Sequence, residues 1–480
     1  ATGFAIQVAE KGNIQLSIDP SLDVANDEGY TLDVTKDGVA VVAKTAQGLF
    51  YGMQSFLQLL PAEIESPSKV NGIAWQAPAV SIKDAPRFGY RGIMLDPCRH
   101  FMPVENVKKY LDVLSLFKMN RMHWHLTDDQ GWRIEIKKYP LLTEKGAWRP
   151  FNVQDRECMR RAKAEDNRDF EIPAEKLRIV QGDTLYGGFY TQDEIKDIVK
   201  YAGIRGIDVI PEIDMPGHML AALASYPELG CTGGPYETAT KFGVFDEVLC
   251  GGNEATLQFA KDVINEIMDI FPSPYIHIGG DECPKLEWKK CPKCQAKIKE
   301  LGLKDTPEHS KENQLQAYFM GEVEKEIIKR GRKMLAWDEI LDGDPARSTT
   351  VMAWTGVKAS IRSAQSGFQT IVCPISHLYF SNPGYNRLTG VTSVARVYNF
   401  EPVNEALTAE EKDRIIGVQG CIWTEWTKDS TKMEWQMMPR IAALSELQWS
   451  RPEKDLDGFL KRLRHQLDLY TLNGYHYKED

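Results

Sequence analysis

Features typical of membrane proteins, nucleic-acid-binding proteins and repeat proteins are missing from this sequence. No apolar run approaches the ~18 residues that a membrane-spanning helix needs. No basic run stands out, and the net charge of -10 argues against nucleic acid as the main partner. No internal repeat or low-complexity segment is visible. The 480 residues, 42% hydrophobic and 26% charged, indicate a globular protein large enough for a barrel and an accessory domain.

Neither an initiator methionine nor a signal peptide is present at Ala1. This start is typical of a trimmed mature chain from which an export signal has been removed. We therefore expect an exported protein, either periplasmic or extracellular.

Cysteine is scarce, and the odd number of nine does not form a disulfide framework in a chain of this size. Cys291 and Cys294, with Cys283 nearby, have the two-residue spacing of a zinc half-site. No second half follows at zinc-finger spacing, although His309 lies downstream. The sequence favours free or buried thiols on a loop, with a structural metal site as the alternative. No cofactor and no active-site metal are expected.

Residues 1–86 have a different pattern from the rest of the chain. A helix is predicted at 47–60, after short alternating strands at 14–18, 30–34 and 39–43. The pattern indicates a small α+β accessory domain over 1–86 that lacks its start. The stretch from Pro78 to Pro86 is the predicted boundary with a catalytic domain over 87–480.

From Phe88 the chain repeats strand, loop and helix, with a polar, charge-mixed insertion at 148–190. Eight strands that alternate with helices predict an α/β fold of the (β/α)8 TIM barrel type rather than an open sheet. The predicted strands cover 92–95, 121–126, 208–213, 275–278, 333–336, 351–353, 370–373 and 417–422. The predicted helices include 104–117, 192–205, 254–271, 314–330 and 434–447.

Polar or aromatic residues follow nearly every predicted barrel strand. The carboxyl ends of the strands form the active-site face of such barrels, so these side chains should line one pocket. In chain order they are Asp96, Arg99, His100, His123, Trp124, His125, Asp128, Asp129, Glu212, Asp214, His218, Asp281, Glu282, Trp337, Asp338, Glu339, Trp354, Tyr379, Trp423, Glu425 and Trp426.

The fourth predicted strand ends in two glycines and two adjacent carboxylates, Asp281 and Glu282. Glycine allows a sharp turn there, which would place both carboxylates at the pocket. The alternative is a helix start, with Asp281 as its cap and Glu282 near the positive end of the helix dipole.

Three tryptophans end other strands, and each by itself is more typical of a core than of a binding site. Trp337, Trp354 and Trp423 at equivalent strand ends, among carboxylates, favour a box that stacks on a sugar ring. Arg99, the carboxylates and the histidines would then bind the hydroxyls.

Two other functions remain open at this point. His123 and His125 form an H-x-H pair that, with His218 and Asp338, could hold the ions of a metal-dependent amidohydrolase. Three aromatic walls are unusual for such a site. A non-catalytic sugar-binding barrel is the other alternative, and it predicts loss of a catalytic carboxylate.

Several longer segments, ordered along about residues 87–450, resemble the β-N-acetylhexosaminidases of glycoside hydrolase family 20. Residues 1–86 resemble the small α+β domain that precedes the barrel in that family. The matching segments are RGIMLD at 91–96, RHF at 99–101, HWHLTDDQGWR at 123–133, PEIDMPGH at 211–218, HIGGDE at 277–282, AW at 336–337 and 353–354, and WTE at 423–425.

The resemblance implies a retaining exo-hydrolase that removes a terminal non-reducing N-acetylglucosamine or N-acetylgalactosamine from glycans or glycoconjugates. In this family the nucleophile is the substrate's own 2-acetamido oxygen, which forms an oxazolinium intermediate. The resemblance assigns Glu282 as the general acid and base. It assigns Asp281 and Tyr379 to the acetamido group, and Asp128 and His218 to a polar chain that tunes Glu282. The oligomeric state stays open.

The resemblance also implies the sugar-binding residues. Trp337, Trp354 and Trp423 would form the pocket walls, while Arg99 and Glu425 would bind sugar hydroxyls.

One position departs from the family pattern. Members commonly carry a carboxylate two residues after the tyrosine, where it contacts the 4- and 6-hydroxyls, and this chain has Ser381. Because a serine does not repel an anion as a carboxylate does, we hypothesise that a 6-sulfated sugar is tolerated. The competing interpretation is that Tyr385, Asn386 or a neighbouring loop closes the same space.

Overall fold

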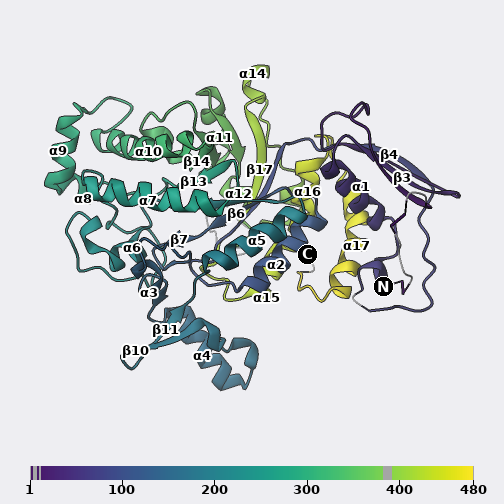
Figure 1. Ribbon diagram of the computed structural model, residues 1–480, viewed down its shortest axis with the longest axis horizontal. Coiled ribbons are helices and arrows are strands. Elements are labelled where there is room, and N and C mark those ends of the chain that lie inside the picture. The colour runs from purple at the N-terminus through teal and green to yellow at the C-terminus, as the bar shows by residue number, and fades with distance from the viewer. Residues whose placement is uncertain (1, 4–7, 10–11, 67, 382–391, 479–480) are drawn as a thin grey trace.

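The computed structural model describes residues 2–3, 8–9, 12–66, 68–381 and 392–478, and these contain a closed barrel of eight parallel strands (Figure 1). The predicted (β/α)8 barrel is confirmed. Its strands are β5 (Tyr90–Leu95), β6 (Arg121–His125), β12 (Asp208–Glu212), β13 (Tyr275–His277), β14 (Lys333–Trp337), β15 (Thr350–Ala353), β16 (Gln369–Val372) and β17 (Ile415–Ile422).

Pairing of the last strand with the first closes the barrel. β17 runs parallel to β5, from Gly417 opposite Tyr90 to Ile422 opposite Leu95. β5 is buried along its whole length, as expected for a parallel strand covered on both faces. Apolar side chains from successive strands fill the interior, including Met94, Ile210, Leu335, Met352 and Ile371.

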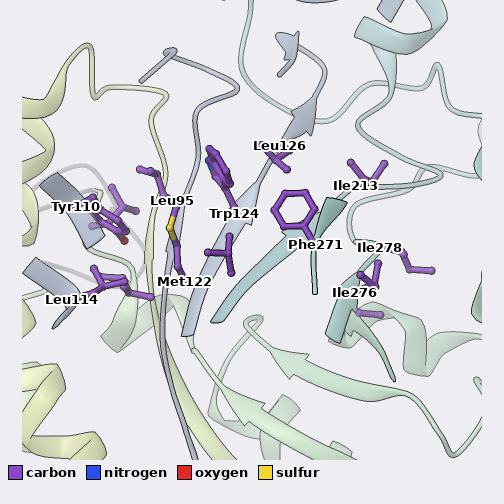
Figure 2. Packing of buried hydrophobic residues seen from close by; sticks show 14 of the residues in the cluster. Leu95, Tyr110, Leu114, Met122, Trp124, Leu126, Ile213, Phe271, Ile276 and Ile278 are labelled. Carbon is purple, nitrogen blue, oxygen red and sulfur yellow. The ribbon is translucent and has the colours of Figure 1, made fainter. Parts of the chain in front are cut away.

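Helices that alternate with the strands cover the outside of the barrel. Local signals begin them, such as the reciprocal capping of Thr191 and Glu194 at the start of α5. The main helices are α2 (Val104–Leu116), α5 (Gln192–Ile204), α7 (Glu254–Ile270), α10 (Lys311–Lys329), α11 (Val357–Gln365), α15 (Ser430–Met437) and α16 (Arg440–Trp449). Figure 2 shows the packing between layers, where Trp124 of β6 lies near Phe271 and Leu126.

Smaller elements occupy the loops between strands and helices. They include β7 (Thr127–Asp128), β8 (Gly131–Trp132), α3 (Leu141–Glu144), α6 (Leu220–Ser225), α8 (Leu286–Lys290), α9 (Pro292–Glu300), α12 (Ile375–Leu378), α13 (Val394–Tyr398) and α14 (Ala409–Lys412).

The single helix predicted at 434–447 is wrong. Two helices, α15 and α16, occupy this region and are separated by Met438 and Pro439. Proline lacks an amide hydrogen and its ring clashes with the preceding helical turn, so the first helix ends before it.

A four-stranded sheet with one helix precedes the barrel, which confirms the predicted α+β unit. The sheet order is β1-β3-β2-β4, and β4 lies in a stretch predicted only as a boundary. The elements are β1 (Ile14–Ile18), β2 (Tyr30–Thr35), β3 (Gly38–Ala43), α1 (Ala46–Gln58) and β4 (Val80–Asp84).

The N-terminal unit is joined to the barrel by a partly buried ion pair and by aromatic packing. Arg91 of β5 lies 2.8 Å from the Glu28 carboxylate, and the rings of Tyr51 and Trp449 are 5.2 Å apart. The C-terminal helix α17 (Leu456–Leu472) packs against residues Ala62–Glu65 of the same unit (Figure 1).

The polar insertion forms a small projection from the barrel (Figure 1). It contains a three-stranded sheet in the order β10-β11-β9, and one helix. Its elements are β9 (Trp148–Arg149), α4 (Val153–Glu165), β10 (Leu177–Val180) and β11 (Asp183–Gly187). Over the described residues, every helix is too short or too polar to span a bilayer.

Candidate active site

A cavity of about 210 Å³ opens at the carboxyl ends of the barrel strands. All eleven residues predicted for the site line it, together with Ile375 and Thr392, which the sequence did not single out. The predicted residues are Arg99, Asp128, His218, Asp281, Glu282, Trp337, Trp354, Tyr379, Ser381, Trp423 and Glu425.

The turn after β13 brings the two adjacent carboxylates to this cavity. Gly279 and Gly280 have φ of 67° and 99°, a region that favours glycine. A Cβ on Gly279 would lie 1.6 Å from Oδ1 of Asp214, so the backbone approach requires glycine. The next helix begins only at Leu286, so the alternative of a helix capped by Asp281 is wrong.

Backbone strain accompanies this arrangement. His218 and Glu282 are non-glycine residues with φ of 51° and 41°. Such left-handed conformations are unfavourable and are enriched at functional sites. Both residues line the cavity, and Nε2 of His218 lies 3.4 Å from Oε2 of Glu282.

Asp281 and Glu282 differ in their surroundings. The Glu282 side chain is 38% exposed, whereas Asp281 is buried. Burial raises the pKa of Asp281 to about 6, with His218 opposing the shift and the carboxylates of Glu212 and Glu282 adding to it. The pKa of Asp281 therefore lies in the mildly acidic range.

His218 connects Glu282 to a buried acidic pair. Its Nδ1 lies 2.9 Å from Oδ2 of Asp129 and 3.6 Å from Oδ1 of Asp128. Burial by itself would lower the pKa of His218, but the surrounding carboxylates raise it well above the ordinary value. The nearer partner is thus Asp129, a rim carboxylate that the sequence noted without assigning a role.

Four aromatic rings form the cavity wall. The rings of Trp354 and Tyr379 are stacked at 6.1 Å, and Trp423 lies 6.0 Å from Tyr379 and 6.2 Å from Trp337. Trp337 is only 1% exposed, and its Nε1 donates to Glu212 at 2.8 Å. Burial keeps the pKa of Tyr379 well above its usual value, so its hydroxyl remains a donor.

Charged side chains complete one side of the cavity. Arg99 forms ion pairs with Asp96 at 3.2 Å and Asp128 at 2.8 Å, and stacks over Trp423 at 5.0 Å. Burial raises the pKa of Glu425, an effect that Arg99 opposes. Ser381 is buried at the cavity, whereas Asn382, Tyr385 and Asn386 lie outside the described residues.

Glu339 is a further residue that the sequence noted at the rim without a role. Its Oε2 accepts a hydrogen bond of 2.8 Å from Nε1 of Trp354, and its Oε1 accepts one of 3.4 Å from the Glu282 amide. Burial, aided by Asp281 and Asp338, raises the pKa of Glu339 to about 8. Glu339 therefore positions both the Trp354 side chain in the cavity wall and the backbone of Glu282.

The alternative amidohydrolase ligands are all engaged with other protein groups. His123 and His125 surround Glu212 at 2.9 and 2.5 Å, beneath the cavity. His218 instead binds Asp129, and Asp338 accepts from the Trp354 amide at 2.6 Å. Nε2 of His125 also lies 2.8 Å from Asp128, and Asp128 lies 3.6 Å from Nδ1 of His218. The histidines therefore share one buried polar network, whereas Asp338 has a separate partner.

Comparisons with known proteins identify the family of this chain. Residues 88–452 match the catalytic domain of glycosyl hydrolase family 20, and residues 1–85 match domain 2 of that family. A beta-hexosaminidase of Porphyromonas gingivalis is 41% identical over 98% of this chain, and the chain spans 58% of that relative's length.

Two solved structures have the same fold. One is a family 20 exo-β-N-acetylglucosaminidase from Vibrio harveyi in complex with N-acetylglucosamine, with a TM-score of 0.81, 32% identity, and coverage of 98% of this chain and 70% of that chain. The other is the Streptomyces plicatus N-acetyl-β-hexosaminidase in complex with Thio-NAglucal, with a TM-score of 0.81, 31% identity, and coverage of 100% and 87%. This chain therefore belongs to glycosyl hydrolase family 20.

Proposed function

We propose that this protein is an exo-acting, retaining β-N-acetylhexosaminidase that releases terminal N-acetylglucosamine or N-acetylgalactosamine from glycans. The observation that carries the proposal is the placement of Asp281 and Glu282 side by side in a cavity with aromatic walls. Relatives described as hexosaminidases support the same chemistry.

Glu282 acts twice in the proposed reaction. Its carboxyl proton passes to the glycosidic oxygen while the carbonyl oxygen of the substrate's 2-acetamido group attacks the anomeric carbon. The bond to the leaving group breaks and an oxazolinium ring forms. The Glu282 carboxylate then takes a proton from water, whose oxygen attacks the anomeric carbon and reopens the ring. Two displacements at one carbon retain the configuration.

Asp281 stabilises the positive charge that develops on the acetamido nitrogen. Its burial supports this role, because an anion acts more strongly in a site with little water. Tyr379 donates a hydrogen bond to the acetamido oxygen and orients it for attack. Holding an internal nucleophile in this way removes much of the entropic barrier of the reaction.

The cationic state of His218 supports the role of Glu282. The imidazolium lies with Nε2 3.4 Å from Oε2 of Glu282 and so orients this carboxyl group for proton transfer. Asp128 and Asp129 hold this imidazolium in place.

Sugar recognition involves the walls and one charged side of the cavity. Trp337, Trp354 and Trp423 contact the apolar faces of the sugar and its acetamido methyl group. Arg99 and Glu425 supply a donor and an acceptor for hydroxyl groups.

The test is a parallel assay of aryl N-acetylglucosaminide, aryl N-acetylgalactosaminide and aryl glucoside. We expect hydrolysis of at least one acetamido sugar with the β-anomer formed first by NMR, and essentially no hydrolysis of the glucoside, which lacks the internal nucleophile. Efficient glucoside hydrolysis would overturn the substrate-assisted mechanism. Binding of N-acetylglucosamine without turnover would favour the non-catalytic sugar-binding barrel instead.

A further inference from the structure

Four cysteine sulfurs converge at a place outside the active-site cavity. They belong to Cys231, Cys250, Cys291 and Cys294, and all four sulfurs lie within 4.8 Å of one another. The sequence indicated only the Cys291 and Cys294 half of this cluster. The other half comes from upstream in the chain, so a search downstream of the half-site could not find it.

The sulfur separations match a mononuclear metal site. Sγ of Cys250 lies 3.7 Å from Sγ of Cys291 and 3.6 Å from Sγ of Cys294, and Cys231 lies 3.8 Å from Cys294. Zinc–sulfur bonds of ~2.3 Å at tetrahedral angles place neighbouring sulfurs about 3.8 Å apart. A disulfide would require about 2.0 Å. The three separations are therefore those of tetrahedral edges.

Backbone contacts bring the two halves together. An isolated antiparallel bridge pairs Gly230 with Leu249, and the residue that follows each of them is a cysteine of the cluster, Cys231 or Cys250. On the other side, Cys291 is the N-cap of α9 and Cys294 lies in its first turn. The positive end of this helix favours thiolates, which are the form that binds metal.

A glycine allows the two halves to touch. A Cβ on Gly252 would lie 2.3 Å from the Lys293 carbonyl oxygen and 2.5 Å from Cα of Cys294. The loop that carries Cys250 thus packs directly against the turn that carries Cys294.

The surroundings are those of a closed structural site. Buried Val248, Trp288 and Leu315 pack around the cysteines and keep water away. Lys289, Lys290 and Lys293 lie next to the ligands in the sequence and offset the negative charge of a tetrathiolate centre.

We propose a tetrahedral structural Zn²⁺ site whose four ligands are the thiolates of Cys231, Cys250, Cys291 and Cys294. All four positions are protein sulfurs, so the ion has no open position for substrate and takes no part in the hydrolase reaction. Four thiols lose their protons as the ion binds.

The site holds loops that carry active-site residues. The Leu249 amide donates to the Pro216 carbonyl at 2.9 Å, two residues before His218. A Cβ on Gly217 would lie 3.1 Å from the Asp281 carbonyl oxygen and 3.2 Å from Cα of Cys283. The ion therefore stabilises the segments on which His218 and Glu282 depend, without contact to the sugar.

Metal content and thiol titration of the full chain test the proposal. Protein purified without chelator should contain one zinc per chain by elemental analysis. In denaturant, a thiol reagent should modify four more cysteines when a chelator is present than when it is absent. Cobalt in place of zinc should show the intense absorption of a tetrathiolate centre. Metal-free protein with the four cysteines oxidised to disulfides would overturn the site.

Matched cysteine variants locate the ion. Cys291→Ser and Cys294→Ser should lose zinc, whereas Cys158→Ser, in the distant helix α4, should retain one equivalent. Zinc retained by both cluster variants, or lost from Cys158→Ser, would contradict the assignment. If the cluster variants fail to fold, the zinc content and the thiol count of the unmodified chain still test whether the four cysteines bind zinc. These readouts do not depend on hydrolase activity.

Discussion

The indole nitrogen of Trp354 donates a hydrogen bond of 2.8 Å to Oε2 of Glu339. The other oxygen of Glu339 accepts from the Glu282 amide at 3.4 Å. One partly buried carboxyl group thus links a cavity wall to the backbone of the proposed general acid.

Glu339→Ala should lower kcat/KM by up to about tenfold, because the partly buried donor on Trp354 loses its acceptor, a loss of about 1 kcal/mol. Glu339→Gln should retain most activity because its amide oxygen can still accept from Trp354. Kinetics with an aryl N-acetylhexosaminide measure both effects. Equal loss in the Gln and Ala variants would contradict this positioning role.

The pH profile provides a second test of Glu339. Its pKa is raised to about 8, so the neutral form is favoured, and stability linked to this group is lost as pH rises from the unfolded pKa through about 8. Ionisation would place a negative charge beside Asp281. We expect kcat/KM to fall above pH about 8 and this limb to weaken in Glu339→Gln. An identical alkaline limb in the variant would exclude Glu339 as its source.

The protonation of Asp281 should determine the acidic limb of the pH–activity profile. Its pKa is raised to about 6, and the proposed role requires the anion, so activity is present above this pH and falls as Asp281 gains a proton below it. Asp281→Asn should reduce turnover strongly, weaken binding of thiazoline mimics of the intermediate, and remove this limb. A profile for the unmodified chain that stays flat from pH about 7 down to about 5 would contradict the assignment.

Glu282→Gln should reduce hydrolysis of natural glycosides by ~10²–10⁴-fold, the usual contribution of general acid–base catalysis. Aryl substrates with good leaving groups should be affected less in the first step, because they need little protonation. Product binding, measured by calorimetry, should persist. Cleavage of an unactivated disaccharide at the original rate would show that another group is the acid.

Ser381→Asp should lower the ratio of kcat/KM for 6-sulfated over unsulfated aryl N-acetylglucosaminide, because a carboxylate repels sulfate. Ser381→Ala is the matched control and should leave the ratio within a few-fold of the original, since it adds no charge. If the aspartate leaves the ratio unchanged, Ser381 does not face the 6-position.

Gly279→Ala should destabilise the fold by at least ~1–3 kcal/mol and abolish activity, because φ is 67° and the new Cβ would meet Asp214. Gly203→Ala is the matched control, since a Cβ there meets open space in α5. We expect that control to be neutral or stabilised by up to ~1 kcal/mol in thermal unfolding. Original stability in Gly279→Ala would show that the turn can rearrange.

Local patterns were sufficient to predict the barrel and most of the cavity residues, although Ile375 and Thr392 were missed. Alternating and apolar runs predicted all eight strands, since β-strand periodicity is a property of neighbouring residues. Strand ends then placed Arg99, Trp337 and Glu425 at one rim, because parallel strands in a barrel all point the same way. Two features that these patterns missed, β4 and the helix break at Pro439, lie beside prolines.

Tertiary structure alone decided which of these side chains meet. Asp128 and Asp129 are adjacent in sequence, yet His218 takes Asp129 as its near partner, because neighbouring side chains point in different directions. Glu339 gained its contact with Trp354 from the next strand, and Cys231 and Cys250 joined a half-site far along the chain. The sequence by itself determined which segments form strands and which residues lie at the carboxyl ends of the barrel strands, because both depend on neighbouring residues in the chain. Partners depend on loop paths and side-chain directions across the sheet, which only the folded chain defines.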